Sequence, residues 1–276
     1  TFREMIMVKP IAVQVANLSF SYDSKPIFSN LTFHLHEKEL TTLIGPNGAG
    51  KTTLLKLLLG LLKPTAGTIH IFGKSPETCS ELIGYVPQNL FYDTLFPITV
   101  KAVIAQGLLG TGLVKKDLDA KLAESLEYLG IESLKNKRFS ELSGGQRRKV
   151  LIARALAAQP RLLILDEPNA NLDVDSVRAL YELLADLKKS TTVLLVTHDI
   201  SLASITVDRV LCLGDVVQET QSIHEHTLDK SITMIDRHYG GQAVLVRHDI
   251  DSHEHECCKE TAIDTEIFPS HKGTKK

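Results

Sequence analysis

The chain has 276 residues, enough for one large domain or two modest ones. Hydrophobic residues make up 43% and charged residues 23%, as in an ordinary globular protein. The formal net charge of −2 excludes a general basic field, so we expect no nucleic acid partner. No apolar run reaches the roughly 18–20 residues that cross a bilayer, so contact with a membrane would come through another chain. The four cysteines show no disulfide framework and favour a reducing compartment.

Short strands and helices alternate along the first 200 residues. Aliphatic and β-branched runs predict strands at 11–20, 31–35, 40–44, 68–72, 162–166 and 193–197. Apolar spacing of three to four residues predicts helices at 51–61, 116–129, 144–158 and 174–188. The stretch from about 89 to 160 interrupts the strand rhythm, so we predict a helical subdomain inserted into an α/β core with a parallel sheet. A final hairpin is expected at 209–219, with its turn at Gly214 and Asp215.

A glycine-rich loop, 45-GPNGAGKT-52, follows the apolar strand 40–44 and opens a helical run. It fits the G-x-x-x-x-G-K-[ST] pattern, whose backbone N–H groups and helix N-terminus suit a di- or triphosphate. In this pattern Lys51 reaches the β- and γ-phosphates and the Thr52 hydroxyl ligates Mg²⁺. The predicted nucleotide-binding residues here are Gly45, Pro46, Asn47, Gly48, Ala49, Gly50, Lys51, Thr52 and Thr53.

Two acidic residues end the apolar strand in 162-LLILDEP-168. Alone, such a pair is usually a solvated strand end. After a phosphate loop, Asp166 is placed to hold Mg²⁺ and Glu167 to polarise the attacking water. We therefore predict that both residues belong to the catalytic site.

The pentapeptide 142-LSGGQ-146 precedes a helical run. Ser143 can cap that helix, while Gly144 and Gly145 expose N–H groups at its positive end, which makes a second anion site. A second phosphate-binding helix end is redundant within one chain. It makes sense if it completes the nucleotide site of a second copy, and a purely structural cap is the alternative.

These motifs together resemble the ATP-binding cassette (ABC) ATPases, over about residues 11–219. The ordered set is completed by Gln88 in 84-GYVPQ-88, by 171-NLD-173, and by His198 in 196-VTHD-199. The resemblance implies a P-loop NTPase core with a parallel sheet, an antiparallel β subdomain and an inserted helical subdomain. It also implies ATP and Mg²⁺, held between two cassettes by the phosphate loop of one and Ser143–Gln146 of the other.

The resemblance also assigns roles to four side chains. Gln88 would sense Mg²⁺ and the attacking water, and Asp173 would couple the two sites of the dimer. His198 would contact the γ-phosphate, and Tyr22, in 18-LSFSY-22, would stack on adenine. Structural roles at a strand end are the alternatives for His198 and Tyr22. Asn169 departs from relatives, which often have Thr after the Asp-Glu-Pro triplet, but it flanks the catalytic residues and replaces none.

Three functions are open to such a cassette: the ATPase of a transporter, an ATPase acting on DNA or ribosomes, and a regulatory protein without transport. Only about 90 residues separate Lys51 from Leu142, too few for a long coiled coil, and the chain has no room for a second cassette. The complete catalytic set disfavours a regulatory protein. We therefore expect an importer ATPase that lies on the cytoplasmic face of the inner membrane and binds permease subunits served by a substrate-binding protein. The aromatic segment 89–100 either receives a permease helix or packs the helical subdomain.

The C-terminal extension, 221–276, contains seven of the eleven histidines. Within it, His253, His255, Cys257 and Cys258 offer the imidazole and thiolate ligands that Zn²⁺ prefers, although their spacing matches no structural zinc finger. A solvated acidic tail is the alternative. Resemblance to zinc-importer ATPases, which often end in a histidine-bearing extension, favours zinc as cargo. Importers of manganese or iron, iron chelates and cobalamin are the other candidates. We place the boundaries at 11–220 for the cassette and 221–276 for the extension.

Overall fold

The computed structural model describes residues 9–23, 25–88, 96–170, 172–197 and 207–213, and the backbone of three later strands. The strands are β1 Ile11–Tyr22, β2 Lys25–His36, β3 Leu40–Ile44, β4 Ala66–Ile71, β5 Ile83–Val86, β6 Leu162–Asp166, β7 Thr192–Val196, β8 Arg209–Leu213, β9 Ile223–Thr227, β10 Ile232–Arg237 and β11 Gly241–Val246. The α-helices are α1 Lys51–Leu58, α2 Val100–Ala105, α3 Lys115–Tyr128, α4 Gly144–Leu156 and α5 Val174–Leu187. Short 3₁₀ helices are η1 Pro76–Thr78, η2 Ser80–Leu82, η3 Gln106–Leu108, η4 Glu132–Leu134 and η5 Phe139–Glu141.

A six-stranded sheet forms the centre of the fold, in the order β5-β6-β7-β3-β8-β9. Its strands are parallel except for β9, which runs antiparallel to β8. Every residue of β3, β6 and β7 is buried, as expected for strands covered on both faces. The carboxyl ends of the parallel strands meet at one edge of the sheet, which is where ligands bind in such folds.

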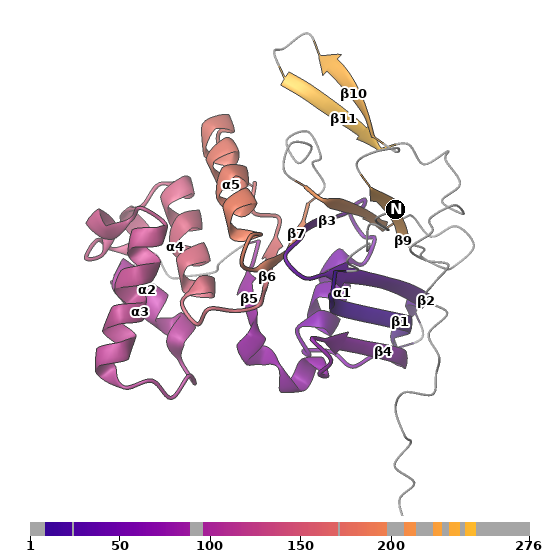
Figure 1. The fold of residues 1–276 in the computed structure, drawn as a ribbon, viewed down its shortest axis with the longest axis horizontal. Helices are drawn as coiled ribbons and strands as arrows, with labels where there is room; N and C mark the ends of the chain where they lie inside the picture. Colours follow the sequence, from indigo (N-terminus) through magenta and orange to yellow (C-terminus); the bar gives the residue numbers. More distant parts are fainter. Residues whose placement is uncertain are drawn as a thin grey trace, which may run out of the picture.

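The two faces of this sheet support two separate cores. Along β6, Leu163 and Leu165 pack on the face covered by α2–α5, whereas Leu162 and Ile164 pack on the other face with α1. The alternation follows from the two-residue period of a strand. Figure 1 shows α2, α3 and α4 together at one side of the molecule, and the smaller sheet at the other.

The smaller sheet is antiparallel, with the strand order β2-β1-β4. Its apolar face packs on α1 and on the central sheet within the second core. The β1–β2 hairpin places Ile27 and Phe28 against the loop that precedes α1. The antiparallel sheet therefore shapes the site that lies at the start of α1.

The helices α2 and α3 pack closely against α4, and we call these three helices the helical layer. A Cβ atom at Gly107 would lie 1.9 Å from the carbonyl oxygen of Arg154 in α4. Only glycine permits this approach between η3 and α4. None of the helices within the described ranges is long and apolar enough to cross a membrane.

The structure confirms all six predicted strands and all four predicted helices, with changes of up to three residues at their ends, except that β2 begins six residues earlier than predicted. It adds β5, α2, β10 and β11, which we did not predict. The strand β5 and the helix α2 were missed because each is short and lacks a clear period. The predicted tight turn at Gly214 and Asp215 is wrong, since Leu213 pairs with Ile223 and the connection must span 214–222. Those connecting residues lie outside the described part of the chain. The strand β9 continues the central sheet beyond the boundary that we expected at residue 220.

Candidate functional site: the phosphate pocket and the start of α4

The phosphate loop joins β3 to α1 at the carboxyl edge of the sheet. The Lys51 ammonium donates to the carbonyl oxygens of Gly45, at 2.6 Å, and Pro46, at 3.0 Å. These bonds fold the loop around the lysine side chain, which is 9% exposed. The helix starts after Gly50, whose φ of 83° is readily adopted only by glycine. A cationic group and a helix N-terminus therefore face the same hollow.

Residues of β2 and β8 lie so close to this loop that two of its positions require glycine. A Cβ atom on Gly50 would lie 2.9 Å from Ile27 Cγ2 and equally close to the Phe28 ring. A Cβ atom on Gly45 would lie 2.6 Å from the carbonyl oxygen of Leu213. Larger residues at either position would displace the loop backbone that has to approach a phosphate.

A pocket of about 280 Å³ opens at this loop. It brings together residues that follow β3 and β5 and residues at the end of β6. Its lining comprises Ile27, Asn47, Gly48, Gly50, Lys51, Thr52, Thr53, Gln88, Asp166 and Glu167. The other predicted loop residues, Gly45, Pro46 and Ala49, shape the loop without lining the pocket.

Asp166 ends β6 at the floor of this pocket and is 7% exposed. Burial raises the pKa of its carboxyl group above the ordinary value. The bond from Tyr85 and the nearby charges of Lys51 and Arg148 act in the opposite direction. The Tyr85 hydroxyl donates to Asp166 Oδ2 over a long 3.4 Å. A partly desolvated carboxylate that faces a polar pocket is typical of a cation site.

Glu167 follows in a strained backbone conformation, with φ of 44°, and is 6% exposed. Its N–H donates to the carbonyl oxygen of Val196 in β7 at 2.8 Å, extending the ladder by one bond. Non-glycine residues rarely adopt positive φ, and such strain clusters at functional sites. The bend turns Glu167 into the pocket beside Asp166.

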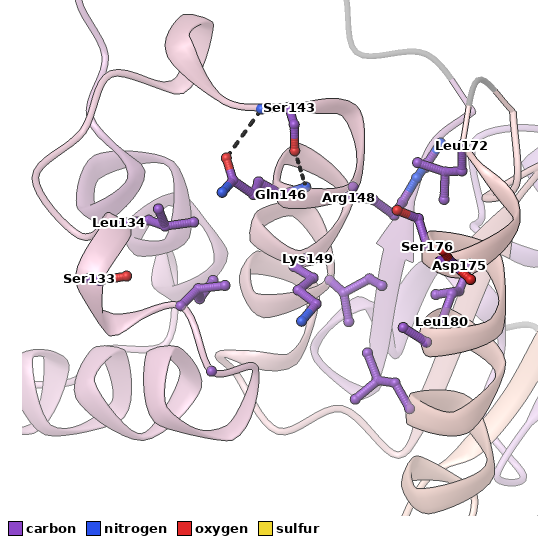
Figure 2. Close-up of a pocket in the computed structure, with 16 residues that line it drawn as sticks. Ser133, Leu134, Ser143, Gln146, Arg148, Lys149, Leu172, Asp175, Ser176 and Leu180 are labelled. Carbon is purple, nitrogen blue, oxygen red and sulfur yellow. Dashed lines mark hydrogen bonds between the residues drawn. The ribbon is translucent and has the colours of Figure 1, made fainter.

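The start of α4 lies in a different pocket, shown in Figure 2. Gln146 N–H donates to Ser143 Oγ at 3.3 Å, and Ser143 N–H donates to Gln146 Oε1 at 3.2 Å, which completes a capping box. Ser143, Gly145 and Gln146 line this pocket of about 450 Å³ between α4 and α5, and Gly144 is the first residue of α4. The structure therefore does not bring 143–146 to the phosphate pocket of the same chain.

Asp173 caps α5 next to this second pocket. Its carboxylate accepts bonds from the Ser176 N–H and the Ser176 hydroxyl, both at 2.9 Å, and these bonds lower the pKa of the carboxyl group. A Cβ atom on Gly145 would lie 2.9 Å from Ser176 Oγ. The starts of α4 and α5 are thus in close contact.

Tyr22 ends β1 on the same hairpin as Ile27. Its ring is 42% exposed and meets the Phe20 ring edge-on, with 4.9 Å between the ring centroids. An exposed ring, oriented by a second one, is available for stacking.

Several predicted residues lie outside the described part of the chain. They are Phe91, Tyr92, Asn171, His198, His253, His255, Cys257 and Cys258. Of the aromatic segment 89–100, the structure describes Phe96, which is 62% exposed, and Ile98, which packs on the helical layer. Among the described residues, no three His, Cys, Asp or Glu side chains are arranged to hold a metal ion.

Two side chains near the pocket were missed by the sequence analysis. Tyr85 contacts Asp166, and Arg148 of α4 donates to the carbonyl oxygens of Pro87 and Gln88. A signal for Arg148 was present, because it precedes the buried Leu151 and Ile152 by three and four residues, which puts a charge on the apolar face of a helix.

Comparison with known proteins decides the family. A family model described as ABC transporter matches residues 28–170, more than half of the chain. The chain belongs to the ABC transporter family. Members that serve as ATP-binding subunits of transporters hydrolyse ATP, so the motifs identified this cassette correctly.

Similar proteins include metal transporters. Over 223 residues the cassette is 40% identical to the zinc uptake system ATP-binding protein ZurA of Listeria monocytogenes, covering 78% of this chain and 87% of ZurA. It is 39% identical over 206 residues to the manganese transport system ATP-binding protein MntB of Bacillus subtilis, covering 73% and 82%. The solved structure of cbiO1 from Clostridium perfringens, part of the ABC transporter complex cbiONQ, matches with a TM-score of 0.71 at 28% identity, over 80% of this chain and 90% of that one.

The raised pKa of Asp166 predicts that its carboxylate lowers the stability of the folded chain at neutral pH. The folded chain disfavours the ionised carboxylate, so at neutral pH Asp166→Asn should raise the melting temperature of the nucleotide-free cassette by a few degrees. The gain should shrink as the pH falls through the raised pKa of the folded chain, and should vanish below 3.8, the ordinary pKa, where the carboxyl group becomes protonated in both states. Thermal unfolding at several pH values measures this effect. Glu127→Gln, on the exposed face of α3, is the control, and a lower melting temperature for Asp166→Asn at neutral pH would contradict the interpretation.

Proposed function

We propose that this chain is the ATP-hydrolysing subunit of an importer for zinc ions. The observation that carries the ATPase part is the pocket that joins the phosphate loop to Gln88, Asp166 and Glu167. The choice of zinc is supported by the zinc uptake protein ZurA, 40% identical over most of both chains.

In the proposed site, the phosphate chain of ATP enters the 280 Å³ pocket at the loop. Lys51 leaves the carbonyl oxygens of Gly45 and Pro46 and binds phosphate oxygens, assisted by the N–H groups at the start of α1. Tyr22 stacks on the adenine ring from the hairpin that also supplies Ile27. Asn47, Gly48 and Thr53 complete the contact with the phosphates.

The donor set in the pocket fits Mg²⁺. Thr52, Gln88 and Asp166 present hydroxyl, amide and carboxylate oxygens, the ligands that this hard cation prefers. When bound, Mg²⁺ neutralises charge on the phosphate oxygens. The elevated pKa of Asp166 fits this role, since an approaching cation favours the ionised form that burial alone disfavours.

Glu167 is the proposed general base. Its carboxylate lies beside Asp166 and takes a proton from the water that attacks the terminal phosphate. The bond from its N–H to Val196 keeps the backbone bend in place while the side chain acts. We assign contact with the γ-phosphate to His198, which follows β7 in the sequence.

A second copy is needed to complete each site. Ser143, Gly144, Gly145 and Gln146 form an anion-binding helix start that lies in a separate pocket from the phosphate loop of the same chain. We propose a homodimer in which this helix start meets the nucleotide of the partner, with Asp173 at the contact between the two sites. The dimer would bind permease subunits at the cytoplasmic face of the inner membrane, as a peripheral subunit, and a substrate-binding protein would deliver the ion.

Manganese is the second candidate cargo. It is supported by MntB, which is 39% identical to this chain over 206 residues. The cassette itself handles ATP in either case, so cargo identity requires a transport measurement.

Replacing Glu167 by Gln should reduce ATP turnover about 100-fold or more, because the amide cannot accept the proton. ATP should still bind and should now hold the dimer together, since hydrolysis no longer separates it. Phosphate release and light scattering with and without ATP measure the two effects. Glu182→Gln, an exposed glutamate on α5, is the matched control. Turnover close to that of the unchanged chain would show that Glu167 is not the base.

Uptake of radioactive zinc tests the cargo. Cells without the gene for this chain should lose zinc uptake, regain it with the unchanged gene, and fail to regain it with the Glu167→Gln variant. Manganese uptake should stay constant in all three. Loss of manganese uptake with zinc uptake intact would overturn the assignment to zinc and support the second candidate.

We further propose that the C-terminal extension, predicted at 221–276, binds Zn²⁺ in its part beyond β9 and modulates the transporter. Its proposed ligands are His253, His255, Cys257 and Cys258, which supply nitrogen and sulfur donors within six residues.

Deleting residues 248–276 should leave basal ATP hydrolysis unchanged and abolish zinc binding. The reason is that the proposed metal ligands lie in the deleted part and the nucleotide residues do not. Equilibrium dialysis with zinc gives the stoichiometry, and replacing only the four ligands by Ala is the control that keeps the chain length. An unchanged zinc stoichiometry after the deletion would rule out this tail site.

A further inference from the structure

Helix α4 is connected to the phosphate pocket by one buried arginine. The Arg148 guanidinium donates from Nη1 to the carbonyl oxygen of Pro87 at 3.1 Å, and from Nη2 to that of Gln88 at 3.4 Å. Arg148 is 8% exposed and also lines the pocket between α4 and α5. Its guanidinium therefore connects the helix that Ser143 caps to Gln88, the residue that we assign to the Mg²⁺ site.

Burying a guanidinium here is costly. Desolvation lowers the pKa of Arg148, and the negative charge of Asp166 opposes this shift. An apolar residue of similar volume would pack the same interface without desolvating a charge. The position of Arg148 is thus better explained by what its N–H groups hold than by stability.

The two hydrogen bonds of Arg148 lie just beyond the last residue of β5 that pairs with β6. The β5–β6 ladder ends at the pair Val86 and Leu165. Pro87 has no N–H to donate, and Gln88 follows it into the pocket. Two charge-assisted bonds at consecutive carbonyl groups fix the direction in which the backbone leaves β5.

We propose that Arg148 is a positioning residue, which sets the place of Gln88 in the phosphate pocket and couples it to the start of α4. The inference rests on the proposed role of Gln88 in ATP hydrolysis. When a partner's nucleotide engages Ser143–Gln146, the rigid helix α4 transmits any displacement through Arg148 to Gln88. The same link acts in reverse, so the occupancy of the pocket biases the position of α4.

The same helix offers a matched control. Arg154 donates from Nη2 to the carbonyl oxygen of Tyr85 at 3.4 Å. Arg154 therefore joins α4 to β5 itself, where Tyr85 pairs with Ile164, whereas Arg148 joins α4 to the two residues that follow β5. Removing the Arg154 guanidinium deletes an equivalent contact and leaves the exit of β5 supported.

The test compares Arg148→Met, Arg148→Lys and Arg154→Met in the full chain. Arg148→Met should lower kcat for ATP about tenfold or more and raise the Mg²⁺ concentration for half-maximal turnover several-fold, while the KM for ATP changes less than twofold. Arg148→Lys keeps the charge and one donor direction, so it should recover part of the loss. Arg154→Met should destabilise the fold to a similar degree without moving the Mg²⁺ dependence.

Backbone NMR relaxation without nucleotide gives a readout that does not need hydrolysis. The order parameter of the Gln88 N–H should be clearly lower in Arg148→Met than in the unchanged chain or in Arg154→Met, because the backbone loses the two bonds to the carbonyl oxygens of Pro87 and Gln88. If Arg148→Met and Arg154→Met behave alike in both measurements, Arg148 is a packing residue and the proposal is wrong. If the unchanged chain does not hydrolyse ATP, the proposed function fails, and the order parameter of Gln88 alone then decides whether Arg148 holds this backbone. Arg148→Lys serves for both readouts if the Met variant does not fold.

Discussion

The parallel pairing of β6 with β5 on one side and β7 on the other is the constraint on which the site depends. Its register aligns Val86 with Leu165 and Asp166 with Val196, so the chain leaves neighbouring strands at almost the same level. Gln88 and the acidic pair Asp166 and Glu167 then emerge at one edge of the sheet, beside the loop that follows β3. A one-residue slip of β6 would exchange its two apolar faces and move both carboxylates, which is why a fully buried strand fixes the site so firmly.

The shape of the site depends on close packing against the phosphate loop, and its chemistry depends on the partial desolvation of Asp166. Ile27 and Phe28 press on Gly50, and Leu213 presses on Gly45, so the phosphate loop is shaped from outside by two sheets. At the end of β6, burial removes water from Asp166, and the pKa of its carboxyl group rises as a result. A carboxylate whose ionised form is destabilised by burial gains more from a cation than a solvated carboxylate does, so the same desolvation lowers stability and favours binding.

Much of the fold could be predicted because the strongest patterns coincide with buried elements. The strands at 40–44 and 162–166 have the bounds that the sequence indicated, since uninterrupted apolar runs leave no ambiguity about their ends. The phosphate loop, Gln88, Asp166 and Glu167 were found from motif order, and the structure gathers them. The four-residue strand β5 and the six-residue helix α2 were missed, because neither is long enough to show a period. Tyr85 and Arg148 were missed because their roles arise from contacts between residues 60–81 positions apart, which no local pattern contains.

The capping box at the start of α4 affects how readily this helix start binds an anion. Ser143 and Gln146 already satisfy each other's polar groups, with both bonds between 3.2 and 3.3 Å. An anion that binds the N–H group of Ser143 or Gln146 has to displace a bond that the helix start makes with itself, so only the N–H groups of Gly144 and Gly145 are open to dilute free ions. A multiply charged phosphate, presented at the right distance by another folded surface, can compete where a dilute free ion cannot. In the proposed homodimer, the cap would therefore set a threshold for contact between two copies, which a bound nucleotide would exceed.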